Sequence, residues 1–261
     1  MKRPFFTIVI VSLNAEKLIS MTLDSVLTQD IDDYEVIVKD GMSKDGTVAK
    51  IPYDPKIIVF EEKDKSIYDA MNQAISHSSG EYIIFMNCGD AFASDDVLRR
   101  IKEFIGDERY GMVYGDYVRD GILHKQPSIL SRFYMYRTPL CHQTVLFDGD
   151  YLRSGSVYNT EYKILGDYDL ELRIMAQRRV RHIGCTVCTY LGGGVSESKE
   201  GIRLKKLERE LILKNNYSKR ERVIFWLKRK LTFPKLRSRL ASSKNIKIKS
   251  LYQKAVNIVN R

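Results

Sequence analysis

Short apolar runs that alternate with helix-like segments constrain this fold more than any other feature of the sequence. Four runs have the apolar character of buried strands: 6–11 (FTIVIV), 34–39 (YEVIVK), 57–60 and 81–86 (EYIIFM). Apolar residues recur at helical spacing in three further segments: 16–27, 67–76 and 97–105. Strands that alternate with helices predict an α/β fold with a mostly parallel sheet, whose ligands bind at the carboxyl ends of the strands.

The second half of the chain is less regular. Strands are expected at 111–118, 144–147 and 181–191, and helices at 168–177, 202–213 and 223–231. A length of 261 residues allows one large domain with an appendage. We therefore predict one α/β domain over residues 1–198 and a basic, amphipathic helical tail over residues 199–261.

Charge divides the chain into the same two parts. Residues 199–261 hold 20 of the 43 Lys and Arg residues but 4 of the 33 Asp and Glu residues, so the remainder is net acidic. Phe225, Trp226 and Phe233 lie among these basic residues, a mixture that suits a helix on an anionic membrane surface. Nucleic acid would attract the same charge, but no nucleic-acid module accompanies it, so we expect no nucleic-acid partner.

Composition excludes several classes of protein. A hydrophobic content of 44% is too high for a disordered chain, and no run approaches the ~20 apolar residues that cross a bilayer. Four cysteines fit a reducing compartment better than a disulfide scaffold. We therefore expect a cytoplasmic protein that is soluble or lies on a membrane surface.

Polar side chains follow three of the predicted strands. Ser12 and Asn14 follow the first strand, Asp40–Thr47 the second, and Asn87–Asp90 the fourth. No glycine-rich phosphate loop follows the first strand, so dinucleotide and P-loop sites lack their phosphate cradle. Carboxylates repel phosphate unless a cation lies between them, which favours a metal-bridged nucleotide diphosphate. Turn formation and helix capping are the alternative roles for these same residues.

Five segments, in this order, resemble motifs of the family 2 glycosyltransferases: FTIVIVSLN, VKDGMSKDGT, DKSIYDAMNQAI, GEYIIFMNCGD and GDYDLELR. The resemblance covers about residues 5–195. Within the family, the sequence is similar to a subgroup found in bacterial polysaccharide clusters. It implies the GT-A fold, a nucleotide-sugar donor that is most often UDP-linked, and inversion at the anomeric carbon. We then expect a lipid-linked saccharide acceptor, with the protein peripheral at the inner face of the plasma membrane.

The resemblance also implies roles for individual polar residues. The nucleotide is expected against Ser12, Asn14, Asp40, Ser43, Asp69 and Asn72. The donor sugar or the acceptor is expected beside Tyr68, Asn87, His142 and Gln143. Asp69 and Asn72 are three residues apart and so share one face of a helix, although a plain amphipathic helix would show the same pattern.

The metal and the catalytic base are assigned from two further segments. Asn87-Cys88-Gly89-Asp90 occupies the place of the family's D-x-D motif, so Asp90 is expected to bind Mg²⁺ or Mn²⁺ together with the diphosphate. Gly166-Asp167-Tyr168-Asp169 lines up with the family's E-D-x-x-L segment, which makes Asp167 the candidate catalytic base. Gly166 replaces the usual glutamate, so Asp169 stays open as the alternative base.

Two other functions stay open. A sugar nucleotidyltransferase belongs to the same fold neighbourhood, although such enzymes usually carry a glycine-rich basic loop after the first strand. A catalytically inactive membrane-surface adaptor is the other alternative, because the D-x-D segment has lost carboxylates.

Overall fold

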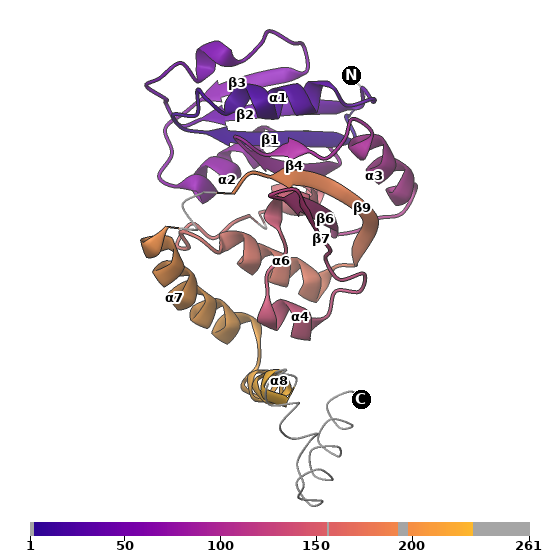
Figure 1. The fold of residues 1–261 in the computed structure, drawn as a ribbon, viewed down its shortest axis with the longest axis vertical. Helices are drawn as coiled ribbons and strands as arrows, with labels where there is room; N and C mark the ends of the chain where they lie inside the picture. The colour runs from indigo at the N-terminus through magenta and orange to yellow at the C-terminus, as the bar shows by residue number, and fades with distance from the viewer. Residues whose placement is uncertain (1–2, 156, 193–197, 232–261) are drawn as a thin grey trace, which may run out of the picture.

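The computed structural model describes residues 3–155, 157–192 and 198–231, and a nine-stranded sheet forms its centre (Figure 1). The strands are β1 (Phe6–Ser12), β2 (Tyr34–Asp40), β3 (Ile57–Glu61), β4 (Tyr82–Asn87), β5 (Ala91–Phe92), β6 (Met112–Arg119), β7 (Ile122–His124), β8 (Val145–Asp148) and β9 (Val180–Tyr190). The helices are α1 (Ile19–Leu27), α2 (Ile67–His77), α3 (Val97–Ile105), α4 (Arg132–Arg137), α5 (Gly149–Arg153), α6 (Gly166–Gln177), α7 (Lys199–Asn216) and α8 (Lys219–Leu231).

The order of the strands confirms the predicted α/β fold. The sheet runs β3-β2-β1-β4-β8-β6-β9-β5, and β7 pairs with β6. The four predicted strands of the first half, β1 to β4, are parallel, whereas β8 runs antiparallel to both β4 and β6. The register sets Ser12 opposite Asp40 and Val11 opposite Asn87. The polar loops after β1, β2 and β4 therefore begin at the same edge of the sheet.

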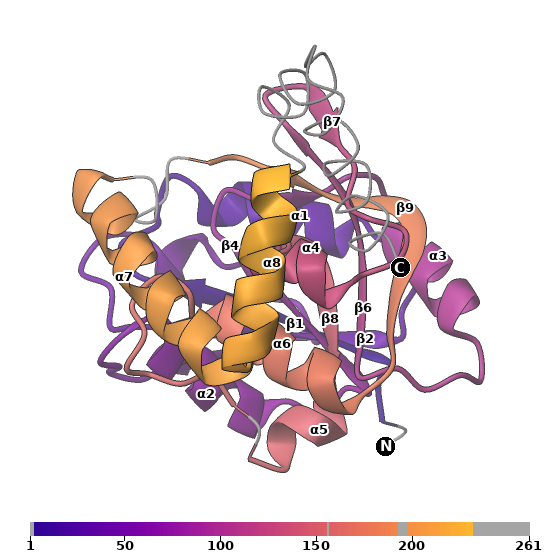
Figure 2. The same cartoon turned by 90° about the horizontal axis from the view of Figure 1, so that it is seen from below.

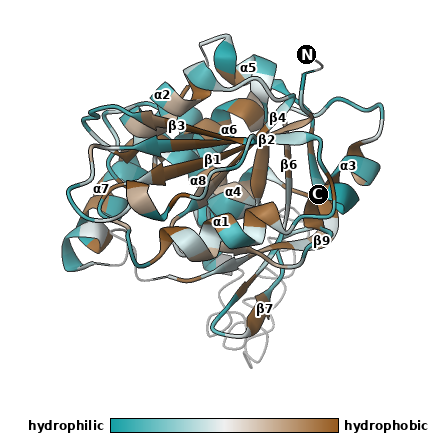
Figure 3. Ribbon diagram, turned by 90° about the horizontal axis from the view of Figure 1, so that it is seen from above, coloured by the Kyte–Doolittle hydropathy of each residue, from teal (hydrophilic) through white to brown (hydrophobic). Residues whose placement is uncertain are grey.

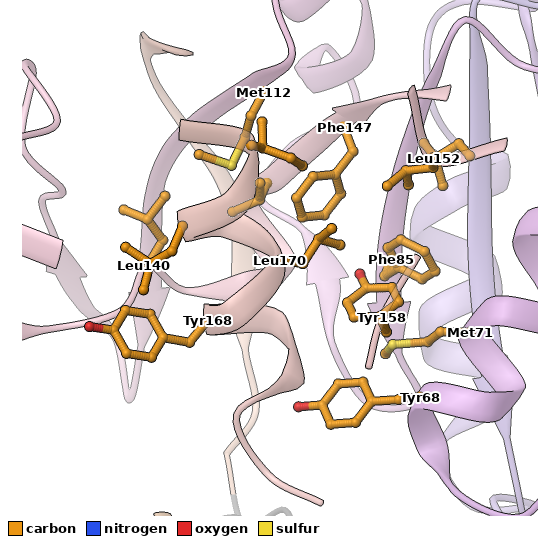
Figure 4. Packing of buried hydrophobic residues seen from close by; sticks show 14 of the residues in the cluster. Tyr68, Met71, Phe85, Met112, Leu140, Phe147, Leu152, Tyr158, Tyr168 and Leu170 are labelled. Carbon is orange, nitrogen blue, oxygen red and sulfur yellow. The ribbon is translucent and has the colours of Figure 1, made fainter. Parts of the chain in front are cut away.

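Both faces of the sheet are covered, which explains why its strands are apolar without alternation. Ile8 and Ile10 of β1 pack in the same cluster as residues of α1 and α3, whereas Val9 packs with residues of α2 and α6. Figure 3 shows the apolar central strands enclosed between helices that are hydrophilic on their outer sides. Figure 4 shows the cluster on the α2 and α6 side, where aromatic rings pack among leucine and methionine side chains.

The predicted basic helices α7 and α8 are present, but α7 belongs to the body of the protein. Ile212 and Tyr217 are buried in the same cluster as α6, and Phe225 of α8 packs against Tyr217 at a centroid distance of 5.9 Å. The predicted boundary at residue 198 therefore separates segments that share a core. Charge suggested that boundary because most of the basic residues of α7 are exposed, although Arg209 packs inward over the ring of Tyr168. Residues 232–261 of the predicted tail lie outside the described residues.

The two C-terminal helices lie on the same side of the molecule, away from β1 to β3 (Figures 1 and 2). None of the described helices combines the length and the apolar character that spanning a bilayer requires.

Candidate active site

The carboxyl ends of β1 and β2 bring Ser12, Asp40 and Ser43 into one hydrogen-bonded group. The hydroxyls of Ser12 and Ser43 donate to Asp40 Oδ2 at 2.8 and 2.6 Å, and the Ser43 N–H donates to Oδ1 at 2.7 Å. Asp40 is fully buried, so these three donors replace the water that its carboxylate would otherwise need. The structure thus places three predicted nucleotide residues side by side, with the Asp40 carboxylate held in a fixed orientation.

Asn14 joins the loops after β1 and β2. Its N–H donates to Ser43 Oγ at 2.8 Å, and its side-chain oxygen accepts the Lys44 N–H at 2.9 Å. Its φ of 51° lies in the left-handed region, which asparagine tolerates better than most residues. Asn14 is therefore in contact with the predicted nucleotide group, and its side-chain amide orders the second loop.

Asp69 and Asn72 of α2, which were predicted to contact the nucleotide, form hydrogen bonds with the protein's own backbone in this structure. Asp69 Oδ2 accepts the Lys65 N–H at 2.8 Å, before the start of the helix. The Asn72 amide holds the backbone of Tyr158 by two hydrogen bonds of 2.9 and 3.0 Å. A nucleotide-binding role for Asp69 and Asn72 stays a prediction, and neither side chain is bonded to the Ser12, Asp40 and Ser43 group.

Asp167 lies in the first turn of α6 and receives a hydrogen bond from Tyr68 of α2. The Tyr68 hydroxyl donates to Asp167 Oδ1 at 3.3 Å. A Cβ at Gly166 would lie 2.8–2.9 Å from atoms of the Tyr68 ring, closer than carbon atoms approach. The glycine that replaces the family's usual glutamate therefore makes room for the ring that contacts Asp167. The carboxylate is partly exposed, and its Oδ2 has no hydrogen-bond partner within the described part of the chain.

Asp169, the alternative base, is bonded to residues other than Tyr68. Its Oδ2 accepts the Arg173 guanidinium at 2.9 Å, and its Oδ1 accepts the Asn216 amide at 3.0 Å. The side chain is buried and its charge is neutralised by Arg173. The geometry therefore favours Asp167 over Asp169 as the base.

Buried polar groups that the sequence interpretation missed lie behind Asp167. Tyr158 stacks on Tyr68 at 5.4 Å, and its hydroxyl is 3.4 Å from His142 Nε2; both tyrosines are visible in Figure 4. Glu171 is fully buried, and burial, with the Asp167 charge as a second cause, raises its pKa well above the usual range. Its spacing of four residues from Asp167 was a detectable signal, because such residues share a helix face.

Tyr68 and Tyr158 connect Asp167 to His142, because the Tyr68 hydroxyl contacts Asp167, Tyr158 stacks on Tyr68, and the Tyr158 hydroxyl lies beside His142 Nε2. Burial lowers the pKa of His142, while the nearby Asp167 charge opposes this shift. The Gln143 amide donates to Asp90 Oδ2 at 2.9 Å. Cys88 in turn lies near both Asp40 and Asp90, and burial together with these charges raises its pKa to about 12. Neighbouring side chains thus join the Asp167 and Asp90 carboxylates, and Val11, which precedes Ser12, lies opposite Asn87 in the sheet.

The Asp90 carboxylate is buried and both of its oxygens accept hydrogen bonds in this structure, so a cation bound here would depend largely on oxygens of the substrate. Burial raises the pKa of this carboxyl, and its Oδ1 accepts the Leu191 N–H at 2.8 Å. The Asn87 side chain also bonds to it. Within residues 3–155, 157–192 and 198–231, no three His, Cys, Asp or Glu side chains gather to hold a metal ion. One carboxylate suffices for Mg²⁺ or Mn²⁺ when diphosphate oxygens and water complete the coordination.

Solved structures of glycosyltransferases resemble this fold. TarS of S. aureus, in complex with UDP-GlcNAc, superimposes with a TM-score of 0.65 at 15% identity, over 97% of this chain and 80% of that chain. The mannosyltransferase PcManGT from Pyrobaculum calidifontis, in complex with GDP-Man and Mn²⁺, gives a TM-score of 0.64 at 18% identity. It covers 100% of this chain and 81% of that chain. The fold is therefore similar to that of the GT-A glycosyltransferases, as predicted.

Proteins with similar amino-acid sequences also include glycosyltransferases. A PGL/p-HBAD biosynthesis glycosyltransferase of Mycobacterium bovis is 29% identical over 210 residues, which cover 76% of this chain and 81% of the relative. The model of Glycosyl transferase family 2 matches residues 7–152, which is more than half of the chain. The chain therefore belongs to glycosyl transferase family 2.

Proposed function

We propose that this protein is an inverting glycosyltransferase that moves a sugar from a UDP-linked donor to a lipid-linked saccharide in bacterial surface polysaccharide synthesis. The observation that carries the proposal is the Asp167 carboxylate, which is partly exposed and whose Oδ2 has no hydrogen-bond partner among the described residues. Contacts through Tyr68, Tyr158 and the consecutive His142 and Gln143 connect it to Asp90. Asp40 and Asp169 have both oxygens engaged in hydrogen bonds, so neither offers a comparable proton acceptor.

In this mechanism Asp167 removes the proton from the acceptor hydroxyl. The acceptor oxygen then forms a bond to the anomeric carbon on the face opposite the diphosphate, and the bond from that carbon to the diphosphate breaks. The products are the inverted glycoside and the nucleoside diphosphate. Tyr68 keeps Asp167 in place through its hydroxyl, and the Ser12, Asp40 and Ser43 group orients the nucleotide.

Asp90 would hold Mg²⁺ or Mn²⁺, which supplies positive charge against the diphosphate leaving group. Asp90→Ala is expected to weaken UDP binding at least about tenfold in the presence of Mn²⁺, equal to about 1.4 kcal/mol, because the carboxylate anchors the cation. Titration calorimetry of UDP with Mn²⁺ and with EDTA measures this difference. An equal loss in both conditions would show that Asp90 acts without a metal.

We also propose that the protein is cytoplasmic and sits peripherally on the inner face of the plasma membrane through α7 and α8. Trp226 of α8 is 52% exposed, and Lys230 lies over its ring. Leu207 and Leu211 are exposed on α7, with Lys206 and Lys214 beside them. Exposed apolar side chains among lysines suit an anionic bilayer surface, where the lysines contact lipid headgroups.

The membrane proposal is tested by substitution, because deletion of α7 would remove part of the core. The triple change Val223→Ser, Trp226→Ser and Leu227→Ser is expected to weaken binding to anionic-lipid vesicles at least about tenfold. Sedimentation with the vesicles measures it. Ile122→Ser with Leu123→Ser, an equally exposed apolar pair in the β6–β7 hairpin, is the control and leaves binding unchanged. Equal binding by the triple variant and the wild type would contradict the proposal.

A panel of nucleotide sugars with Mg²⁺ or Mn²⁺, scored for release of the nucleoside diphosphate, tests the proposed reaction itself. Release of UDP from a UDP-sugar supports transfer. Pyrophosphate release from a nucleoside triphosphate would instead identify a sugar nucleotidyltransferase. The absence of any nucleotide binding would favour an inactive adaptor.

A further inference from the structure

A glutamate of α7 holds the backbone immediately before the helix that carries Asp167. The N-cap residue of α6 is Leu165, whose side chain makes no capping hydrogen bond. Glu208 of α7 binds the three residues that lead into the helix: Oε1 accepts the Lys163 N–H at 2.6 Å, and Oε2 accepts the N–H groups of Ile164 and Leu165 at 3.0 and 2.8 Å. Its side chain is buried, with 9% of the residue exposed.

These contacts are strong for physical reasons. A carboxylate that accepts backbone N–H groups makes charge-assisted hydrogen bonds, about twice as strong as neutral ones. The N-terminus of a helix also carries a partial positive charge, which the carboxylate stabilises. The three N–H groups belong to consecutive residues, and Asp167 follows two residues after Leu165. Any shift of this backbone therefore moves the Asp167 carboxylate relative to Tyr68.

We propose that Glu208 is a positioning residue, which fixes the backbone at residues 163–165 and so directs the Asp167 carboxylate toward the acceptor hydroxyl. The inference rests on the proposed role of Asp167 as the base. It also gives α7 a reason to pack as part of the body: the helix reaches the site through this inward-facing side chain, while Leu207 and Leu211 face outward.

Glu208→Gln tests the proposal, because one carboxylate oxygen becomes an NH₂ group that faces a backbone N–H and cannot accept it. We expect kcat to fall roughly 10- to 100-fold, as misplacement of a reacting group by about 1 Å costs up to that much. The dissociation constant for UDP should stay within about threefold, since Ser12, Asp40 and Ser43, which are proposed to bind the nucleotide, lie on β1, on β2 and in the loop after β2. Hydrogen exchange at amides 163–165 should become faster.

Two matched variants separate positioning from general damage. Glu210→Gln makes the same chemical change at an exposed position of α7 and should leave both kcat and amide exchange unchanged. Asn216→Ala removes a different bond from α7 to α6, the one to Asp169, without touching residues 163–165. An equal fall of kcat in Asn216→Ala would overturn the proposal, because loosened packing alone would then explain the loss.

A more conservative variant keeps the test decisive if Glu208→Gln folds poorly. Glu208→Asp keeps the charge but is too short to reach all three N–H groups, so kcat should lie between those of the wild type and Glu208→Gln. Wild-type kcat in both Glu208 variants would overturn the positioning role while donor turnover persists. Failure of the wild type itself to turn over any donor would instead refute the proposed function, and the two failures are thus distinct.

Discussion

Asp167→Asn is expected to lower kcat by roughly 10²- to 10⁴-fold, the usual contribution of a general base, and to leave the affinity for UDP nearly unchanged. Asparagine keeps the shape of the side chain and its contact with Tyr68, but its amide is far too weak a base to take the proton of the acceptor. Steady-state release of UDP in the presence of acceptor measures kcat, and calorimetry measures UDP affinity.

Asp169→Asn is the matched control, two residues away on the same helix. Asp169 is bonded to Arg173 and Asn216, so its loss should lower the free energy of unfolding more than it lowers kcat. Persistent activity in Asp167→Asn, combined with its disappearance in Asp169→Asn, would reverse the assignment of the base.

Glu171→Gln is expected to remove a pH dependence of stability from the folded protein. Burial raises the pKa of Glu171 in the native state, so the native protein keeps a proton that the unfolded chain loses above about pH 4.5. Below that pH both states hold the proton and this term is constant. Above it the wild type loses up to about 1.4 kcal/mol of stability per pH unit, until the native group also ionises.

Urea unfolding from pH 4 to pH 8 measures this effect. The stability of Glu171→Gln relative to the wild type should rise with pH, because glutamine cannot ionise in the unfolded chain. Glu61→Gln, the same chemical change at an exposed position of β3, is the control. Parallel curves for Glu171→Gln and the wild type would mean that Glu171 is ionised in the native state.

Local pattern predicted much of the fold. The strands β1 to β4 and the helices between them lie within a few residues of their predicted positions, because buried apolar runs and helical spacing are properties of the sequence itself. The strand β8 was also predicted within one residue, but not its antiparallel direction, and the short β5 and β7 were not predicted, since strand direction and pairing depend on distant partners. The boundary at residue 198 was predicted from the distribution of charge. Charge depends mostly on the exposed residues of α7 and gives no sign that Ile212 of the same helix is buried in the core.

The candidate site likewise contains some residues that local sequence pattern predicts and others that it does not. Asp40, Asp90 and Asp167 are detectable because each follows a strand or begins a helix in a motif that the family shares. Glu208 is remote in sequence from Asp167, and only the packing of α7 on α6 brings it to residues 163–165. Both aspartates suit the first turn of a helix equally well, but the spacing of four residues between Asp169 and Arg173 was a signal that this carboxylate is paired.

A crystal structure of the protein with Mn²⁺ and a non-hydrolysable UDP-sugar analogue tests the central claim most directly. The account predicts that the diphosphate lies near Asp90 and that the Asp167 carboxylate lies on the opposite face of the anomeric carbon, within reach of an incoming hydroxyl. An anomeric carbon that lies beyond the reach of Asp167, or a diphosphate on the same side as this carboxylate, would contradict it.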